Sequence, residues 1–251
     1  MSTIYLFGGS SELGNSSANQ IMSDQSARYS KFVKILRAES FTGSQDELIW
    51  DPTSAKKVET FLKTLSFSKG DLAIIATGTI TLADTETSFI ELDHQLIEQL
   101  IWINLTLPLI VVSKVASDLR KLGGGEIIVF TSAAAFPPQP SNLIYSHSKA
   151  TLDALICQLR KPLSGVKVRT MIVRSAFSAT PLNEGRQATP LAITPYELGV
   201  SVSKGHRKSK YIIWVPRSFA LISFFLMFVP GLNEVANFIV KKSKSKQELS
   251  S

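Results

Sequence analysis

A hydroxyl, a phenol and an amine lie between residues 131 and 149 at a spacing that suits proton transfer. Ser132 follows the apolar run 126–130, and Tyr145 and Lys149 stand four residues apart. Side chains at this spacing project from the same face of a helix. An ammonium group beside a phenol favours the phenolate and lowers the phenol pKa from its free value of about 10. We therefore interpret Ser132, Tyr145 and Lys149 as one catalytic unit, in which Tyr145 exchanges a proton with a substrate oxygen.

A second candidate site lies at the N-terminus, where the strand predicted at residues 4–7 leads into a glycine-rich turn at residues 8–14. Glycine lets the backbone approach a pyrophosphate closely. The helix predicted after the turn offers free N–H groups and the positive end of its dipole. The sequence therefore predicts a dinucleotide phosphate site. Its candidate residues are Gly8, Ser10, Ser11, Glu12, Leu13 and Gly14.

These two sites together resemble the short-chain dehydrogenase/reductase family, and the resemblance covers almost the whole chain. It is carried by the glycine-rich turn, the separation of thirteen between Ser132 and Tyr145, and the presence of Ser148 just before Lys149. The resemblance implies that Ser132 orients a substrate carbonyl and Tyr145 transfers the proton. It also implies that Lys149 holds the nicotinamide ribose and tunes Tyr145. Asn104 matches the family's fourth active-site residue, which helps to hold a proton-relay water.

The cofactor residues that the resemblance adds lie at the ends of predicted strands. Arg37 follows the strand predicted at 32–36, and an arginine there would pair with the 2′-phosphate of NADP(H). Glu39 would instead accept hydrogen bonds from the ribose of NAD(H). Arg37 comes first, so the sequence favours NADP(H) and leaves NAD(H) possible; a solvated surface arginine is the alternative interpretation. The other candidate residues are Asp51, Ala76, Gly78 and Thr180, together with Tyr145 and Lys149.

The chain departs from the family pattern in three places. Glu12 replaces the middle glycine of the turn, and residues 75–78 read Ile-Ala-Thr-Gly where the family has Asn-Asn-Ala-Gly. Residues 175–176 are Ser-Ala in place of the Pro-Gly that precedes Thr180. The prolines and small side chains of residues 181–195 predict a mobile substrate lid. Asp51 has a second interpretation, as the N-cap of a helix predicted at 54–65.

The order of apolar runs predicts an α/β fold of Rossmann type, a doubly wound parallel sheet of seven strands with helices on both faces. Two helical stretches around Pro108 are expected, with Asn104 between them, and the helix after Lys149 is expected to end near Pro162. We predict a reductase domain at 1–216 and a C-terminal extension at 217–251. The strands are expected at 4–7, 32–36, 48–51, 71–78, 126–130, 166–173 and 211–215.

Length and composition limit the class of protein. The chain has 251 residues, of which 44% are hydrophobic and 19% charged, as in a globular domain and not a disordered one. Cys157 is the single cysteine, which excludes an internal disulfide and a cysteine metal cluster. The N-terminus shows no signal-peptide pattern, which predicts a cytoplasmic protein. The sequons at Asn15 and Asn104 fall inside functional elements, and we interpret both as coincidental.

The C-terminal part is apolar and basic. Residues 219–229 contain one polar side chain and, as a helix, would span about 16 Å, about half of a bilayer core. From Lys204 onward, nine Lys or Arg residues stand against two acidic ones. One interpretation is a buried helix that closes the domain. The other is a helix in an anionic membrane surface, at the inner face of the plasma membrane. Its basic flanks would be Arg207, Lys208, Lys210 and residues 241–246. The tail shows no pattern that indicates nucleic-acid binding.

Within the family, residues 8–14, 74–78 and 208–216 are similar to actinobacterial reductases of lipid-linked keto-sugars. This resemblance implies a keto-sugar on a polyprenyl phosphate as substrate, the arabinose donor for cell-wall arabinan as product, and a flavin oxidase of the same pathway as partner. The family implies a homodimer or homotetramer. Two alternatives stay open. The first is a membrane-surface reductase of another apolar ketone, such as a steroid, retinoid or fatty-acyl ketone. The second is a non-catalytic NADP-sensing protein, against which the intact Ser132, Tyr145 and Lys149 argue.

Overall fold

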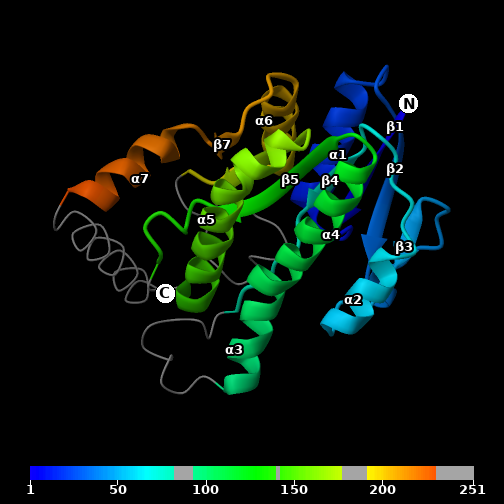
Figure 1. The fold of residues 1–251 in the computed structure, drawn as a ribbon. Coiled ribbons are helices and arrows are strands. Elements are labelled where there is room, and N and C mark those ends of the chain that lie inside the picture. The colour runs from blue at the N-terminus through cyan, green and yellow to red at the C-terminus, as the bar shows by residue number, and fades with distance from the viewer. Residues whose placement is uncertain (82–92, 140–141, 177–190, 230–251) are drawn as a thin grey trace.

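The structure, a computed structural model of the chain, describes residues 1–81, 93–139, 142–176 and 191–229. A single parallel sheet with the strand order β3-β2-β1-β4-β5-β6-β7 forms its centre (Figure 1). The strands are β1 (Ser2–Phe7), β2 (Tyr29–Leu36), β3 (Glu47–Ile49), β4 (Leu72–Ile75), β5 (Gly125–Ser132), β6 (Val168–Ser175) and β7 (Ile212–Val215). The predicted seven-stranded, doubly wound sheet is confirmed. The domain boundary predicted after residue 216 stays a prediction.

Helices cover both faces of the sheet, because side chains of both faces are apolar in the central strands. Val129 and Ile172 pack in a core under α2, α4 and α5, which lie on the near side of the sheet in Figure 1. Ile128 and Val173 point the other way, into a core under α1 and α6. The helices are α1 (Glu12–Asp24), α2 (Ala55–Leu62), α3 (His94–Ile101), α4 (Leu107–Lys121), α5 (Leu143–Gly165), α6 (Pro195–Arg207) and α7 (Ser218–Phe228), with a 3₁₀ turn η1 (Ala38–Ser40) and a π-helical turn η3 (Trp102–Thr106).

The two helical stretches predicted around Pro108 are one continuous helical rod from His94 to Lys121, formed by α3, η3 and α4. Pro108 has no N–H to donate, and the π turn just before it interrupts the regular i→i−4 ladder at that point. By length and composition alone this rod could cross a membrane. Val111 and Val115 are fully buried against the sheet, as in the core helix of an α/β domain.

Two more helix ends differ from the prediction. Helix α5 continues through Pro162 to Gly165. The proline removes one hydrogen bond near the end of a long helix, while Leu163 still packs against the core. The predicted lid at 181–195 ends in regular structure, because Ile193 is buried in the core and Thr194 caps α6 in a reciprocal pair with Glu197. Residues 181–190 lie outside the described residues.

Helix α7 extends away from the sheet after β7 (Figure 1). Leu221, Phe224 and Phe228 are 63%, 56% and 67% exposed, and in the described part of the chain Ser223 is the one buried side chain of this helix. The interpretation as a buried helix is therefore wrong for the described residues. The basic residues at 207–210 precede β7 and α7 follows it, so the strand separates them. Residues 241–246 lie outside the described part.

Candidate active site

The glycine-rich turn joins β1 to α1 at the edge of the sheet where the strands end. Gly8 has a φ of +86°, and a Cβ there would lie 2.9 Å from the carbonyl oxygen of Ala76, just after the end of the neighbouring strand β4. Gly14 lies in the first turn of α1, where a Cβ would come within 2.8 Å of Leu6 and 2.9 Å of Ala76. Ser11 is the N-cap, and its Oγ accepts a hydrogen bond of 3.2 Å from Gly14 N. Close packing against Leu6 and Ala76 therefore shapes the turn, and its role as a pyrophosphate site stays a prediction.

Asn15 holds this turn together and was missed by the sequence analysis. Its Nδ2 donates to Gly9 O at 2.5 Å and to Ser11 O at 2.9 Å, which ties the turn to the first turn of α1. The sequence did carry a signal for this role, because Asn15 lies one helical turn after the glycine-rich turn. The amide that the sequon suggested for glycosylation is engaged in these bonds.

A cavity of about 1100 Å³ opens next to the turn, over the ends of β1, β2 and β4. Arg37 lies on its wall but is exposed, and its Nε pairs with Glu39 at 3.0 Å. The cofactor candidates on the wall are Gly8, Ser10, Ser11, Glu12, Leu13, Arg37, Ala76 and Gly78; the wall also includes Thr77, Thr79 and, from α3 and η3, Gln95, Glu98, Gln99 and Trp102. The predicted residues of three separate sequence regions therefore come together around one cavity.

Asp51 does not line the cavity, although Trp50 and Pro52 on either side of it do. Its carboxylate accepts hydrogen bonds from the backbone and hydroxyl of Thr53, at 3.0 and 2.6 Å, and from Lys57 at 2.6 Å. The hydrogen bond from Lys57 is the largest cause that lowers the pKa of Asp51. The N-cap of α2 is Ser54, so the capping interpretation of Asp51 is wrong.

Asn104 is fully buried in η3. Its Nδ2 donates to Thr79 O at 2.8 Å and its Oδ1 accepts from Thr79 N at 3.0 Å, so the amide fixes the backbone that leaves β4. A π turn is a common way to place one residue at a functional site inside a long helix. Thr79 is the second residue that the sequence analysis missed, and no local motif marks it.

Lys149 lies between Asn104 and the end of β5. Its Nζ donates to Thr77 O at 3.0 Å and Phe130 O at 3.4 Å, and only 3% of the residue is exposed. Burial lowers the pKa of Lys149 from 10.5 to about 8. A Cβ on Gly78 would lie 3.4 Å from both Lys149 Nζ and Asn104 Oδ1, so glycine leaves the space that these two polar groups share.

Ser132 and Tyr145 are the other two members of the predicted catalytic unit. Ser132 is the last residue of β5, is 7% exposed, and its Oγ accepts a hydrogen bond of 3.1 Å from Ala134 N. Tyr145 is the third residue of α5 and is partly exposed, one helical turn before Lys149. Both therefore lie at the edge where the strands end, which is where open parallel sheets bind ligands. Thr180 lies outside the described residues.

The cavity has the features that a dinucleotide requires. The start of α1 supplies free N–H groups for phosphates, and Gly8 leaves the backbone open. Thr77 lies on the wall, is 9% exposed, and its Oγ1 has no hydrogen-bond partner among the described residues. An orphaned hydroxyl beside a buried ammonium suits a ligand that carries hydroxyl groups. The residues present fit a nicotinamide dinucleotide.

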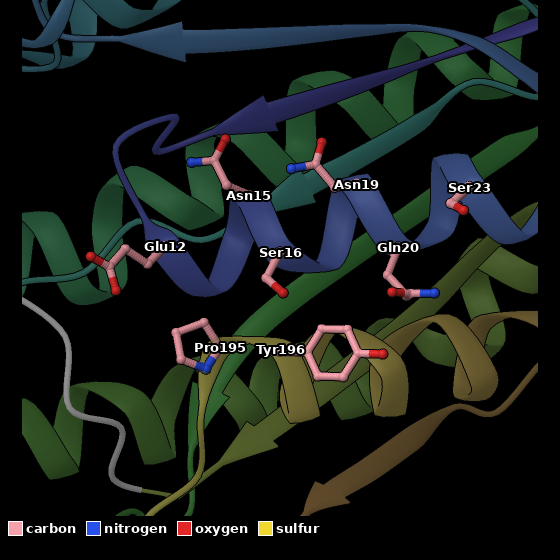
Figure 2. A pocket seen from close by; sticks show the side chains of 8 residues that line it. All are labelled: Glu12, Asn15, Ser16, Asn19, Gln20, Ser23, Pro195 and Tyr196. Carbon is pink, nitrogen blue, oxygen red and sulfur yellow. The ribbon is translucent and has the colours of Figure 1, made fainter.

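Glu12 also borders a shallow groove on the other side of α1. Figure 2 shows this groove between α1 and the start of α6, where Ser16 and Gln20 of α1 point toward Pro195 and Tyr196. The side chains on the α1 side are Glu12, Asn15, Ser16, Asn19, Gln20 and Ser23. The predicted catalytic residues line neither this groove nor the larger cavity. The larger cavity is the candidate cofactor site because the glycine-rich turn forms part of its wall, and because Lys149 and Asn104 bond to the backbone of Thr77 and Thr79 on that wall.

Comparison with known proteins agrees with this arrangement. The family model described as short chain dehydrogenase matches residues 7–190. An uncharacterized oxidoreductase of Mycobacterium tuberculosis is 31% identical over 101 residues, which are 40% of this chain and 41% of the relative. An uncharacterized oxidoreductase of Streptomyces coelicolor is 33% identical over 107 residues, 41% of each chain. These alignments thus cover less than half the length of either relative.

Solved structures show the same fold over nearly the full chain. A short-chain dehydrogenase from Burkholderia cenocepacia in complex with NADP superposes with a TM-score of 0.76 at 17% identity, covering 94% of this chain and 96% of that one. A short-chain dehydrogenase from Sphingobium yanoikuyae in complex with NADPH superposes with a TM-score of 0.73 at 20% identity, covering 98% and 96%.

Proposed function

Since the chain belongs to the short-chain dehydrogenase family, we propose that it is an enzyme that reduces a carbonyl group with NADP(H). The environment of Lys149 carries the proposal. Its ammonium is buried beside the cavity and donates to two neutral carbonyl oxygens, and no ion pair of Lys149 is found among the described residues. A buried charge without a carboxylate partner is costly and is retained where a ligand or a reaction uses it.

The proposed roles follow from where these side chains lie. NADPH, when bound, supplies the hydride. Tyr145 gives its proton to the carbonyl oxygen as that oxygen becomes an alcohol, and Ser132 holds the same oxygen by a hydrogen bond. Lys149 favours the phenolate of Tyr145 and donates to ribose hydroxyls. Asn104 keeps the backbone of Thr79, and with it one wall of the cavity, in place.

Arg37 supports NADP(H) over NAD(H). Its side chain lies on the cavity wall at the end of β2, where it would pair with a 2′-phosphate. Glu39, its present partner, would face the hydroxyl of NAD(H) instead. The NADP and NADPH complexes of the Burkholderia and Sphingobium proteins also support NADP(H). NAD(H) is the alternative.

The proposed substrate is a keto-sugar on a polyprenyl phosphate. Residues 8–14, 74–78 and 208–216 resemble the decaprenylphosphoryl-2-keto-ribose reductase. We therefore propose its reaction, which gives decaprenylphosphoryl-arabinose for cell-wall arabinan and follows a flavin-dependent oxidase. The exposed apolar helix α7 supports a lipid substrate, because it follows the C-terminal end of β7, at the same sheet edge as Ser132. Another apolar ketone is the alternative.

Helix α7 also supports a position at the inner surface of the plasma membrane. Its sequence from Ser218 to Phe228 carries no charge, Arg217 precedes it, and the end of the chain is rich in lysine. Such a helix suits the interface of an anionic membrane. For self-association, the proposed surface is the outer face of α5, where Leu155 and Leu159 are exposed. Pairing there would give a homodimer or homotetramer.

A turnover assay tests the reductase proposal. Oxidation of NADPH is followed with the keto-sugar lipid and, in parallel, with a steroid ketone. We expect turnover with the lipid-linked sugar and a loss of it in Tyr145→Phe. Turnover of the steroid ketone alone would favour the alternative substrate class. NADPH binding without turnover of either ketone would favour the non-catalytic sensor.

Vesicle co-sedimentation tests the membrane proposal separately. We expect binding to anionic vesicles that weakens with salt, since attraction to lipid headgroups is screened over about 10 Å at 0.1 M. Replacing Phe224, Phe225 and Phe228 with serine should release the protein while activity on a soluble analogue survives. Wild-type protein that ignores anionic vesicles would contradict the proposal.

A further inference from the structure

A buried ion pair lies on the catalytic helix outside the cofactor cavity. Arg174, near the end of β6, donates from Nε to Asp153 Oδ2 at 2.8 Å and from Nη2 to Oδ1 at 2.6 Å. The two side chains are 14% and 2% exposed. Thr131 Oγ1 adds a hydrogen bond of 3.0 Å to Asp153 Oδ2. Asp153 stands one turn beyond Lys149 and two turns beyond Tyr145, so all three lie on one face of α5.

The guanidinium of Arg174 also contacts two aromatic rings. Its Cζ lies 4.1 Å from the ring centre of Phe136 and 4.8 Å from that of Trp214. The two rings contact each other edge to face, with centres 5.5 Å apart. Trp214 is the strand neighbour of Arg174 on β7, and Phe136 lies four residues after Ser132 in the segment that leads to α5. One side chain therefore joins β6, β7, α5 and the segment that follows Ser132.

Stability alone does not account for such an arrangement. Desolvation of a buried ion pair offsets much of its attraction, so an apolar pair of similar volume can be as stable. The planar guanidinium instead fixes the positions of its neighbours. It donates two parallel hydrogen bonds to a carboxylate, and its two faces stack on aromatic rings. Phe136 and Trp214 are partly exposed and lie at the edge of the sheet where Ser132 ends β5. They are therefore available to a substrate.

We propose that Arg174 is a positioning residue for the substrate of the proposed reductase. Held by Asp153, it fixes Phe136 and Trp214 as an aromatic wall beside Ser132, and this wall orients a ring-shaped substrate so that its carbonyl reaches Ser132 and Tyr145. The inference rests on the proposed function. Aromatic rings pack well against the apolar face of a sugar or another saturated ring, and they offer little to a small acyclic ketone.

The chain provides a matched control for Arg174. Arg169 lies on the same strand and also pairs with a largely buried carboxylate, that of Glu126, but at the opposite end of β6 from the catalytic edge. Both arginines are replaced by lysine, which keeps the charge and removes the planar fork. Each variant is compared with the wild type in thermal unfolding, NADPH binding, and turnover of cyclohexanone and butanone.

We expect Arg174→Lys to raise the KM for cyclohexanone about tenfold or more, a loss of about 1.4 kcal/mol, and to leave the KM for butanone and the Kd for NADPH within about twofold. Trp214→Leu should raise the KM for cyclohexanone to a similar extent. The variant that combines Arg174→Lys with Trp214→Leu should have a KM no higher than either single variant, since both changes remove the same aromatic wall. Arg169→Lys should lower the unfolding temperature without changing the ratio of the two KM values. Equal effects of the two arginine variants on that ratio, or additive effects in the double variant, would overturn the proposal.

A readout without substrate separates this inference from the proposed function. The fluorescence emission of Trp214 is obtained as the difference between the protein with Trp214 and the same protein with Trp214→Phe. This difference spectrum should change when Arg174→Lys is introduced and stay the same when Arg169→Lys is introduced. If the wild type turns over neither of these ketones nor the keto-sugar lipid or the steroid ketone while Trp214 responds in this way, the reductase proposal fails and the aromatic wall stands. An unchanged emission in Arg174→Lys overturns the wall itself.

Discussion

The burial of Lys149 predicts a stability that depends on pH in an unusual direction. The pKa of its ammonium is lowered to about 8 by burial, and in the unfolded chain it returns to about 10.5. Below pH 8 both states carry the proton, and the folded state bears the full cost of the buried charge. Between about pH 8 and 10.5 the unfolded state binds the proton and the folded state does not, so unfolding becomes less favourable as the pH rises. Above this range the cost is gone.

The size of the effect follows from the same two values. A pKa that falls from 10.5 to about 8 corresponds to about 3 kcal/mol. For a chain of 251 residues this is a shift of roughly 6 to 12 °C in unfolding temperature. Lys149→Met removes the titrating group and keeps the length of the side chain. The wild type should therefore gain this much relative to Lys149→Met between pH 7 and pH 10.5.

Thermal unfolding of both proteins without cofactor, at half-unit steps of pH, measures this difference. Both proteins also carry Tyr145→Phe, because Lys149 is proposed to shift the titration of that phenol. The other groups that titrate in the range are common to both proteins and cancel in the comparison. A difference in unfolding temperature that stays constant from pH 7 to 10.5 would refute the reasoning. It would mean that Lys149 is as well solvated in the folded protein as in the unfolded chain.

Three further predictions concern the cofactor and the chemistry. Tyr145→Phe should abolish turnover, measured by NADPH oxidation, while the Kd for NADPH stays within about twofold, because the ring and Lys149 remain; turnover near that of the wild type would contradict the role. Arg37→Ala should raise the Kd for NADPH about ten- to a hundredfold and leave that for NADH unchanged, since a charge-assisted pair contributes about 1.5–3 kcal/mol; a wild type that prefers NADH would direct attention to Glu39. Gly8→Ala should lower stability by about 1–3 kcal/mol in denaturant unfolding, because the φ of +86° and the contact with Ala76 both oppose a Cβ; an unchanged midpoint would contradict this.

The sheet was the most predictable part of the fold. Its central strands β4 and β5 are apolar runs that are buried on both faces, so composition alone identifies them. The edge strand β3 is short and largely exposed. Helix ends were harder. Pro108 and Pro162 each suggested a break, and tertiary packing kept both helices continuous. Local propensity cannot indicate how much packing a helix gains beyond a proline.

The roles of the candidate site residues stay predictions, and the structure shows where these residues lie. Lys149 is buried in α5 and Gly8 lies in the turn after β1. The sequence did not indicate the roles of Asn15, Thr79 and Arg174. Arg174 and Thr79 bond to residues that are distant in the sequence, and Asn15 and Thr79 act through backbone atoms, which are the same in every residue type. Asp51 was given two roles from its position, as a cofactor contact and as a helix cap. Ser54 caps α2 instead, and Asp51 does not line the cavity.

The π turn at Trp102–Thr106 gives the helical rod a built-in change of register. A π turn contains one residue more than the α-helical turn it replaces, and one residue corresponds to about 100° of rotation about a helix axis. The wider π turn absorbs this rotation, so α3 and α4 keep the alignment of one continuous rod, which the buried valines of α4 hold to the sheet. Deleting Ile103 would return the turn to regular α-helix and leave Gln95 and Gln99 on the cavity wall. It would change the turn itself, where Asn104 holds the backbone of Thr79, so a one-residue deletion would disturb the cavity at this point without any change to the sheet.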